Sequence, residues 1–236
     1  MPLNCIWYTL FTVAAYLFGA LPFMIFIGHI RGLDLSREPD LHSALWYRVG
    51  RNWGLLGFFL DVFKGVLPVL VSFFLGWPVV VALAGSLAAL AGQMWPVFRR
   101  FYGERGNTVS LGLVASLSFT YATPWILIVA LIPAGVGFFI RTARRWKTSG
   151  NSLNERMKFG GSQSRSLPLG VIIGFASTPV TSVLFSQPAG QTLGLAGMVV
   201  LLLLRRLTGG LRADLKNSNR PGRVMLNRLL YDRSEV

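Results

Sequence analysis

Long apolar stretches without charge alternate with short polar segments along most of this chain. A membrane-spanning helix needs roughly 20 apolar residues to cross a hydrocarbon core about 30 Å thick. We predict helices over seven stretches: 5–30, 54–75, 78–98, 109–121, 124–140, 166–185 and 193–204. The fourth and the seventh are short for a full crossing. The pattern therefore predicts an all-α polytopic membrane protein with about seven transmembrane helices.

The basic residues favour this count and indicate an orientation. All of the 23 Lys and Arg residues except Lys64 fall into four segments that are separated from one another by apolar stretches. Seven crossings place these segments on one face, and cytoplasmic loops carry the excess of Lys and Arg. Merging 109–121 with 124–140 would move the basic residues of 141–165 to the outside. We therefore predict a multi-pass plasma-membrane protein with its N-terminus outside and its C-terminus in the cytosol.

The polar segments also suggest how the chain is organised. Residues 1–204 are predicted to form a single transmembrane helical domain, with a cytosolic insertion loop at 141–163 that is rich in Ser, Gly and Asn. The first apolar stretch lacks the basic region that precedes a signal peptide, so we expect it to remain in the protein. Residues 205–236 are predicted to be a basic cytosolic C-terminal tail. Its stretch 224–233 fits a short amphipathic helix on the membrane surface.

Composition excludes several classes of site. A net charge of +14 would suit nucleic acid, but here the charge follows the topology and attracts anionic lipid at roughly 1 kcal/mol per basic residue. We therefore expect the lipid bilayer, and no nucleic acid, as a partner. One Cys and two His residues leave no internal disulfide and no cysteine-based or histidine-rich metal centre, so no metal site is predicted.

Two charged residues stand inside the second apolar stretch, in the sequence FFLDVFKG. Asp61 and Lys64 are three positions apart, so both point to one face of a helix. Ionisable groups in a membrane helix normally face the interior of the bundle or a polar cavity. One interpretation is a mutual ion pair that locks helix packing. The other is that Lys64 reaches an anionic ligand while Asp61 orients it.

The sequence GQMWPVFRRFYGERGN, at 92–107, leads from the third stretch into a basic segment. Gly103 and Gly106 flank Arg105, and glycines let backbone N–H groups form a concave anion nest to which Arg105 adds a bidentate phosphate contact. A plain turn is the alternative. Arg48 and Arg165 add cations in two other basic segments, where each could equally be a topology anchor.

The order of these features along the chain resembles the bacterial acyl-phosphate glycerol-3-phosphate acyltransferase family. The sequence LDVFKG matches the family's Leu-Asp-x-x-Lys-Gly. GQMWPVFRRFYGERG is similar to its Gly-His-x-Phe-Pro-Val-Phe…Gly-Gly-Lys-Gly, and SRSLPLGVI to its Thr-Arg-x-x-Ser-Leu-Gly-x-Ile. The resemblance covers nearly the whole chain and implies the family's helical membrane fold.

The departures from the family pattern fall on polar positions. The first family motif, Gly-Ser-Gly-Asn-x-Gly-Ala-Thr-Asn-x-x-Arg, is replaced by REPDLHSALWYR at 37–48, where only Arg48 survives and Asp40 stands for an Asn. Gln93 replaces the motif histidine, and Glu104–Arg105 replaces the Gly-Lys pair. Gln93 donates a hydrogen bond but cannot carry a proton near neutral pH. Pro168 stands where the family has serine and offers neither a hydroxyl nor an N–H.

The resemblance implies transfer of an acyl group from acyl phosphate to the 1-hydroxyl of glycerol 3-phosphate, giving lysophosphatidic acid in phospholipid biosynthesis. Gln93 and Arg105 are the implied catalytic residues, and Asp61 is the implied orienting residue. The implied phosphate-binding residues are Arg48, Lys64, Gly103, Gly106 and Arg165. No metal or organic cofactor is expected, and the enzyme that makes the acyl phosphate is an expected functional neighbour.

The altered positions also support a rival hypothesis of a different class. A homologue that keeps the scaffold but has lost catalysis could bind a lipid or regulate a partner. A small transporter is a third possibility, but it requires several polar groups at mid-depth in the membrane. Only Asp61 and Lys64 lie inside an apolar stretch, so the sequence favours the first two.

Overall fold

The computed structural model describes all residues except 1, 37, 39, 148–164, 217–219 and 233–236. The described residues form helices and connecting segments only, which confirms the all-α fold. They divide into two units: 1–124 with Ala189–Gly194, and Trp125–Pro188 with 195–236. The predicted division into a domain at 1–204 and a tail at 205–236 stays a prediction.

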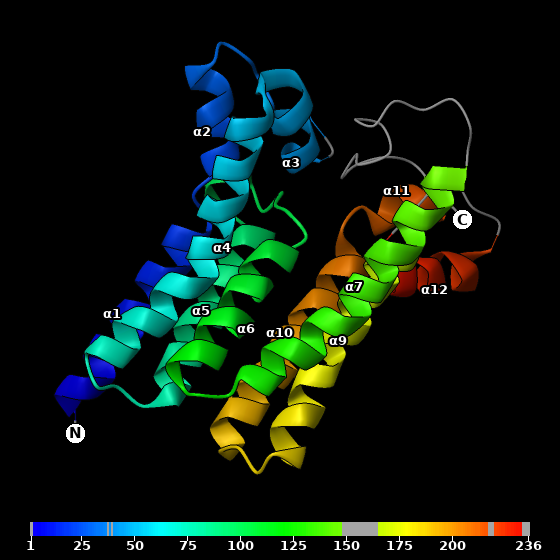
Figure 1. Cartoon of the computed structure of the whole chain (residues 1–236). Helices are drawn as coiled ribbons and strands as arrows, with labels where there is room; N and C mark the ends of the chain where they lie inside the picture. Colours follow the sequence, from blue (N-terminus) through cyan, green and yellow to red (C-terminus); the bar gives the residue numbers. More distant parts are fainter. Residues whose placement is uncertain (1, 37, 39, 148–164, 217–219, 233–236) are drawn as a thin grey trace. The chain divides into compact units, whose positions relative to one another are not determined.

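The first unit is built from long helices and a set of short ones. Its elements are α1 (Pro2–Gly19), α2 (Phe23–Ile30), α3 (Leu41–Ala44), η1 (Leu45–Val49), α4 (Arg51–Phe74), α5 (Val79–Met94), η2 (Val97–Arg99) and α6 (Asn107–Thr120). Helix α5 packs against both α1 and α4, and α4 packs against α6, so these four helices lie side by side (Figure 1).

The first apolar stretch is not one helix, and this corrects the predicted span 5–30. The axis bends by 41° between 4–19 and α2. Pro22 lies in the break, and proline both lacks an N–H and clashes with the preceding turn of a helix. The carbonyl of Leu21 is left at the break, outside the regular helical ladder, where it accepts a hydrogen bond from Lys64 Nζ at 2.8 Å.

Glycines let the helices of the first unit approach closely. A Cβ added to Gly65 of α4 would lie 2.1 Å from the carbonyl oxygen of Val109 on α6, and one on Gly92 of α5 would lie 2.1 Å from that of Tyr16 on α1. Contacts this short leave no room for a methyl group. The glycines therefore fix the distances between α4, α6, α5 and α1, and with them the positions of the polar residues that these helices carry.

The second unit contains three long helices and two short ones. They are α7 (Pro124–Lys147), α9 (Ser166–Leu184), α10 (Ala189–Thr208), α11 (Leu211–Lys216) and α12 (Pro221–Tyr231). Helix α7 extends beyond the predicted end at 140, and most of the predicted loop 141–163 lies outside the described residues. Helix α12 confirms a helix in the tail; its place on a membrane surface stays a prediction.

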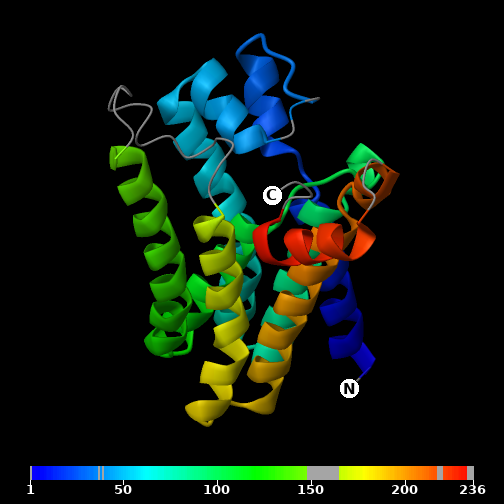
Figure 2. The same cartoon turned by 90° about the vertical axis from the view of Figure 1, so that its right-hand side faces the viewer.

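Two buried arginines hold α12 against its neighbours. Figure 2 shows α12, in red, at the end of α9 and α10. Arg206 donates to the carbonyl oxygen of Leu229 at 2.8 Å and to that of Pro168 at 3.0 Å. Arg228 donates from Nε to the carbonyl oxygen of Arg206 at 3.1 Å and pairs with Asp214. These basic residues therefore bind the tail to the helices, beyond any effect on topology.

Replacing Arg206 with Ala should detach the tail helix. The change removes the charged donor from three buried or half-buried carbonyl groups, and hydrogen bonds to charged groups each contribute about 1.5–3 kcal/mol. We expect faster proteolytic cleavage between α10 and α12, measured in detergent micelles. Arg223→Ala, which alters an exposed residue of α12, is the control and should cleave at the wild-type rate; equal rates for both variants would contradict the assignment.

Five described helices are long and apolar enough to cross a membrane, and six if α1 and α2 form one broken span. They are 51–74, 79–99, 124–144, 166–184 and 189–208. Helix α6 has only 14 residues, which agrees with the short fourth stretch of the sequence. Helix α10 is longer than the predicted 193–204, because it begins at Ala189 and continues through Arg205 and Arg206 to Thr208. The count of seven and the orientation stay predictions.

Candidate functional site

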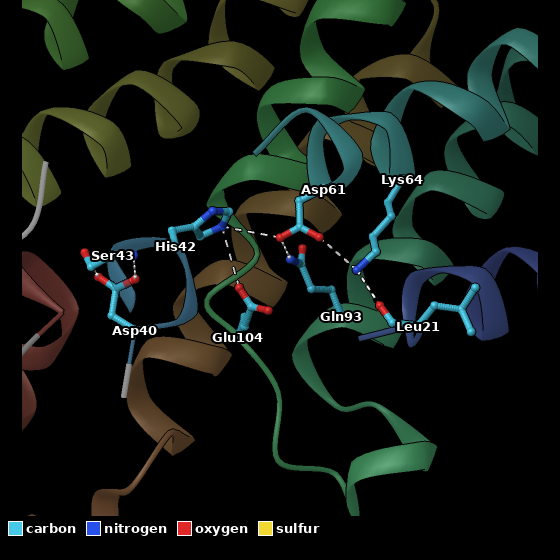
Figure 3. Close-up of polar contacts among 8 residues, drawn as sticks. All are labelled: Leu21, Asp40, His42, Ser43, Asp61, Lys64, Gln93 and Glu104. Atoms are coloured by element: carbon cyan, nitrogen blue, oxygen red, sulfur yellow. Dashed lines mark hydrogen bonds and ion pairs between the residues drawn. The ribbon is translucent and has the colours of Figure 1, made fainter. Parts of the chain in front are cut away.

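Asp61 of α4 is the centre of a polar cluster in the first unit (Figure 3). Its carboxylate is fully enclosed. Lys64 Nζ lies 2.9 Å from Oδ1, and the amide of Gln93, on α5, donates to Oδ2 at 2.7 Å. His42 Nε2 lies 3.3 Å from the same Oδ2. Three helices thus direct polar side chains onto one buried carboxylate.

Lys64 has its charge satisfied inside this cluster. Its side chain is 2% exposed, and its ammonium group contacts Asp61, the carbonyl oxygen of Leu21 and the face of the Phe23 ring at 5.0 Å from the centroid. This geometry confirms the predicted common face for Asp61 and Lys64, and it shows the mutual ion pair. A phosphate-binding role for Lys64 stays a prediction.

His42 reaches the cluster from α3, the short helix that follows α2 in the chain. The Asp40 carboxylate caps α3 by accepting the backbone N–H of Ser43 at 3.1 Å, which suits the preference of Asp for helix N-termini. The cap sets the start of the helix, and His42 follows two residues later. Its side chain is 31% exposed, so His42 connects the buried Asp61 with the surface.

Glu104 completes the cluster from the segment between η2 and α6. Its backbone N–H donates to the carbonyl oxygen of Gln93 at 3.0 Å. A Cβ at Gly103 would lie 2.1 Å from that same oxygen, so glycine is needed for the segment to pass this close to α5. The carboxylate oxygen Oε2 of Glu104 lies 3.6 Å from His42 Nε2, and the side chain is 21% exposed.

Two residues of the cluster, His42 and Glu104, lie outside the membrane-spanning helices, and both have raised pKa values. Burial alone would lower the pKa of His42, but its contact with Asp61 and the negative charges of Glu104, Asp61 and Asp40 outweigh burial and raise it. Burial, with the charge of Asp61, raises the pKa of Glu104 to about 7, although His42, Lys64 and Arg99 act in the opposite direction. Glu104 therefore titrates near neutral pH, and His42 keeps its proton to a higher pH than an ordinary histidine does.

The same cluster resembles a metal site only in its spacing. Ligand atoms of His42, Asp61 and Glu104 all lie within 4.8 Å of one another. However, Lys64 already forms an ion pair with Oδ1 of Asp61, and the Gln93 amide donates to Oδ2. An ammonium group beside the central carboxylate opposes a second cation. The donors present thus suit proton exchange better than cation binding.

The other predicted residues are placed as follows. Gly106 has φ +78° and is the N-cap of α6, where no side chain caps the helix. Arg105 stands exposed beside it. Arg48 is exposed and pairs with Glu38. The exposed residue Arg165 belongs to the second unit, where its guanidinium lies 6.0 Å from the centroid of the Tyr231 ring. The roles of these residues stay predictions.

Sequence reasoning missed His42 and Glu104. The two residues are 62 positions apart in the chain, and neither belongs to a periodic pattern. The available signal was that both stand within motif segments at positions where the family pattern quoted above has glycine. His42 and Glu104 add ionisable side chains at these two positions, and Gln93 replaces the motif histidine. Taken one at a time, these changes indicate that the family motifs have degenerated. The structure brings all three positions together at Asp61.

The apolar helices and the enclosed charged cluster define a multi-pass membrane protein with a polar site in its helical core. The family model described as glycerol-3-phosphate acyltransferase matches residues 9–209. The chain belongs to this family, a family of membrane enzymes.

Individual relatives agree with this assignment. Glycerol-3-phosphate acyltransferase 4 of Dehalococcoides mccartyi (strain CBDB1) is 27% identical over 93% of this chain and 86% of its own length. Glycerol-3-phosphate acyltransferase of Desulforudis audaxviator (strain MP104C) is 34% identical over 50% of this chain and 63% of its own. A crystal structure of PlsY (YgiH), an integral membrane glycerol 3-phosphate acyltransferase in its glycerol 3-phosphate form, matches with a TM-score of 0.63 and 22% identity. That match covers 89% of this chain and 90% of the other, and it shows that the fold is shared.

Proposed function

We propose that the protein transfers an acyl group from acyl phosphate to the 1-hydroxyl of glycerol 3-phosphate, giving lysophosphatidic acid. The observation that carries this proposal is that the altered motif positions do not leave Asp61 isolated. His42, Lys64 and Gln93 surround its carboxylate, so a polar site around Asp61 stands within a family match over 9–209. A homologue without catalysis would not need to retain such a site.

The reaction needs positioning more than covalent catalysis. The acceptor hydroxyl oxygen bonds to the acyl carbon, the bond from that carbon to the phosphate oxygen breaks, and inorganic phosphate leaves. The acyl group is already activated, so no protein nucleophile is required. The protein holds two phosphate groups and offsets the charge of the transition state, which are the two effects that account for most rate enhancement in such transfers.

We assign the phosphate contacts to the segment around Gly103–Gly106. Helix α6 begins immediately after Gly106 without a side-chain cap, and an uncapped helix N-terminus presents backbone N–H groups to an anion. Arg105 adds a guanidinium that suits bidentate phosphate binding. Arg48 is a further proposed phosphate contact in the same unit, and the phosphate role of Arg165, in the second unit, stays a prediction of the family resemblance. Gln93, whose amide donates to Asp61, orients that carboxylate and acts on the substrates through it.

The test is acyl transfer by the purified protein in lipid, with palmitoyl phosphate and labelled glycerol 3-phosphate. We expect labelled lysophosphatidic acid above a control without enzyme. Arg105→Ala should raise the KM for glycerol 3-phosphate about 10- to 150-fold, because losing a charged hydrogen bond costs about 1.5–3 kcal/mol. Arg100→Ala, in the same basic segment, is the control and should leave KM unchanged. A folded protein that forms no product would favour the non-catalytic homologue.

A further inference from the structure

We propose that Glu104 is the general base of this site and that His42 is its positioning residue. Glu104 takes the proton of the acceptor hydroxyl, while His42 Nε2, held against Asp61, keeps the Glu104 carboxylate in place. This inference rests on the proposed acyl transfer and adds the proton acceptor that the reaction requires. It also assigns a role to two residues that depart from the family motifs.

Exposure separates the acid–base groups of the cluster. Asp61 and Lys64 are enclosed at 1% and 2% side-chain exposure, so neither reaches a substrate from its present position. Glu104 keeps 21% of its side chain exposed. It lies in the same short segment as Arg105 and the glycines to which we assign phosphate binding. Of the possible proton acceptors in the cluster, the Glu104 carboxylate is therefore the nearest in sequence to the residues that we expect to bind the substrate.

Contacts from two directions hold Glu104. The backbone N–H of Glu104 is fixed to the carbonyl oxygen of Gln93, and its Oε2 lies 3.6 Å from His42 Nε2. His42 Nε2 also contacts Asp61 Oδ2 at 3.3 Å, which prevents the ring from turning away without losing that contact. The imidazole thus bridges a buried carboxylate and an accessible one, and only the accessible one can exchange a proton with substrate.

The charges around Glu104 fit a proton acceptor. With His42 protonated, two cations (His42 and Lys64) balance two anions (Asp61 and Glu104), and Arg99 also faces Glu104. Asp40, Asp61 and Glu104 are the charged groups around His42. When Glu104 accepts a proton, the cluster gains one positive charge. This gain coincides with the growth of negative charge on the departing phosphate, so proton transfer and charge stabilisation support each other.

The atoms of the step balance without a further reactant. The acceptor O–H bond breaks, and its proton moves to the Glu104 carboxylate. The hydroxyl oxygen forms the new ester bond to the acyl carbon, and the electron pair of the broken acyl–oxygen bond leaves with phosphate. The leaving phosphate or water then takes the proton from Glu104, which returns to its carboxylate form.

Glu104→Gln is the decisive variant. It keeps the shape of the side chain but cannot accept a proton, and general base catalysis typically contributes about 10²–10⁴ in rate. We expect kcat to fall at least about 100-fold while KM for glycerol 3-phosphate changes little. Asp34→Asn removes an exposed carboxylate that lies 4.0 Å from His29, outside the cluster, and is the matched control. A kcat for Glu104→Gln within threefold of wild type would overturn the proposal.

The pH dependence of the acyl-transfer rate in His42→Gln shows whether His42 positions Glu104 or has only a structural role. The wild-type rate should rise with pH as Glu104 loses its proton, with a midpoint near its pKa of about 7. Because the positive charge of His42 lowers the pKa of Glu104, removing this charge should move the rising limb to higher pH. His29→Gln, at the exposed His29–Asp34 pair, should leave the limb in place. An unchanged limb in His42→Gln would contradict the positioning role.

An infrared titration of the carboxyl band makes the result independent of acyl transfer. The wild-type protein should show a carboxyl group that titrates near pH 7 and is missing in Glu104→Gln. If wild type forms no lysophosphatidic acid but this band is present, the proposed function fails while the proton-accepting cluster stands. If the band is absent, Glu104 is not a base near neutral pH and the present proposal is overturned, whatever the activity.

Discussion

Asp61→Asn should destabilise the folded protein by about 3–5 kcal/mol, the usual cost of leaving one member of a buried ion pair without its partner. The side chain of Lys64 is 2% exposed, and Asp61 is its only carboxylate partner in the ion pairs of the described chain. Asparagine preserves the size of the side chain and can still accept the Gln93 amide. The loss therefore reports the missing charge and not a cavity.

The double variant Asp61→Asn with Lys64→Met tests this explanation. Removing both charges eliminates the uncompensated ammonium group, so the double variant should lose less stability than the two single variants together. Denaturant unfolding in detergent micelles gives the three free energies. Asp34→Asn, at an exposed pair, should change stability by less than about 1 kcal/mol. Additive losses in the double variant would mean that Asp61 and Lys64 do not act as a pair.

The sequence predicted the parts of this cluster that follow from helix period alone. Asp61 and Lys64 are three positions apart, and α4 (51–74) closely follows the predicted stretch 54–75. Their ion pair is one of the two interpretations that the sequence allows. Gln93 near the end of α5 was also identified from its motif position. Asp61 and Lys64 are predictable because they are close together in the sequence, and Gln93 is predictable because it lies within a family motif.

Other parts depend on tertiary contacts that one sequence does not specify. The contact between His42 and Asp61 joins α3 to α4 across a change of chain direction, and no periodic pattern encodes it. The hydrogen bond from Lys64 to the carbonyl oxygen of Leu21 exists only because Pro22 interrupts the first helix. The buried role of Arg206 was hidden by its place in a basic segment, where the charge alone already had an explanation.

Gly65→Ala should disrupt the site more severely than any change of an exposed residue. The new Cβ would lie 2.1 Å from the carbonyl oxygen of Val109 and 2.7 Å from the backbone nitrogen of Leu113. Backbone atoms of α6 cannot move aside individually, so α4 and α6 must separate. Asp61 is one turn before Gly65 on α4, and Glu104 lies just before α6. Their separation therefore moves Asp61 away from the accessible carboxylate.

We expect a stability loss of about 3 kcal/mol, at the upper end for overpacked cores, and loss of most acyl-transfer activity. Gly135→Ala is the matched control in α7, because a Cβ there meets no atom within 4 Å. That variant should be neutral or up to about 1 kcal/mol more stable, since alanine favours the helix. Thermal unfolding in micelles and the acyl-transfer rate measure both effects. Equal behaviour of the two variants would show that the α4–α6 distance does not control the site; a loss confined to Gly65→Ala would show that helix packing sets the geometry of the Asp61 cluster.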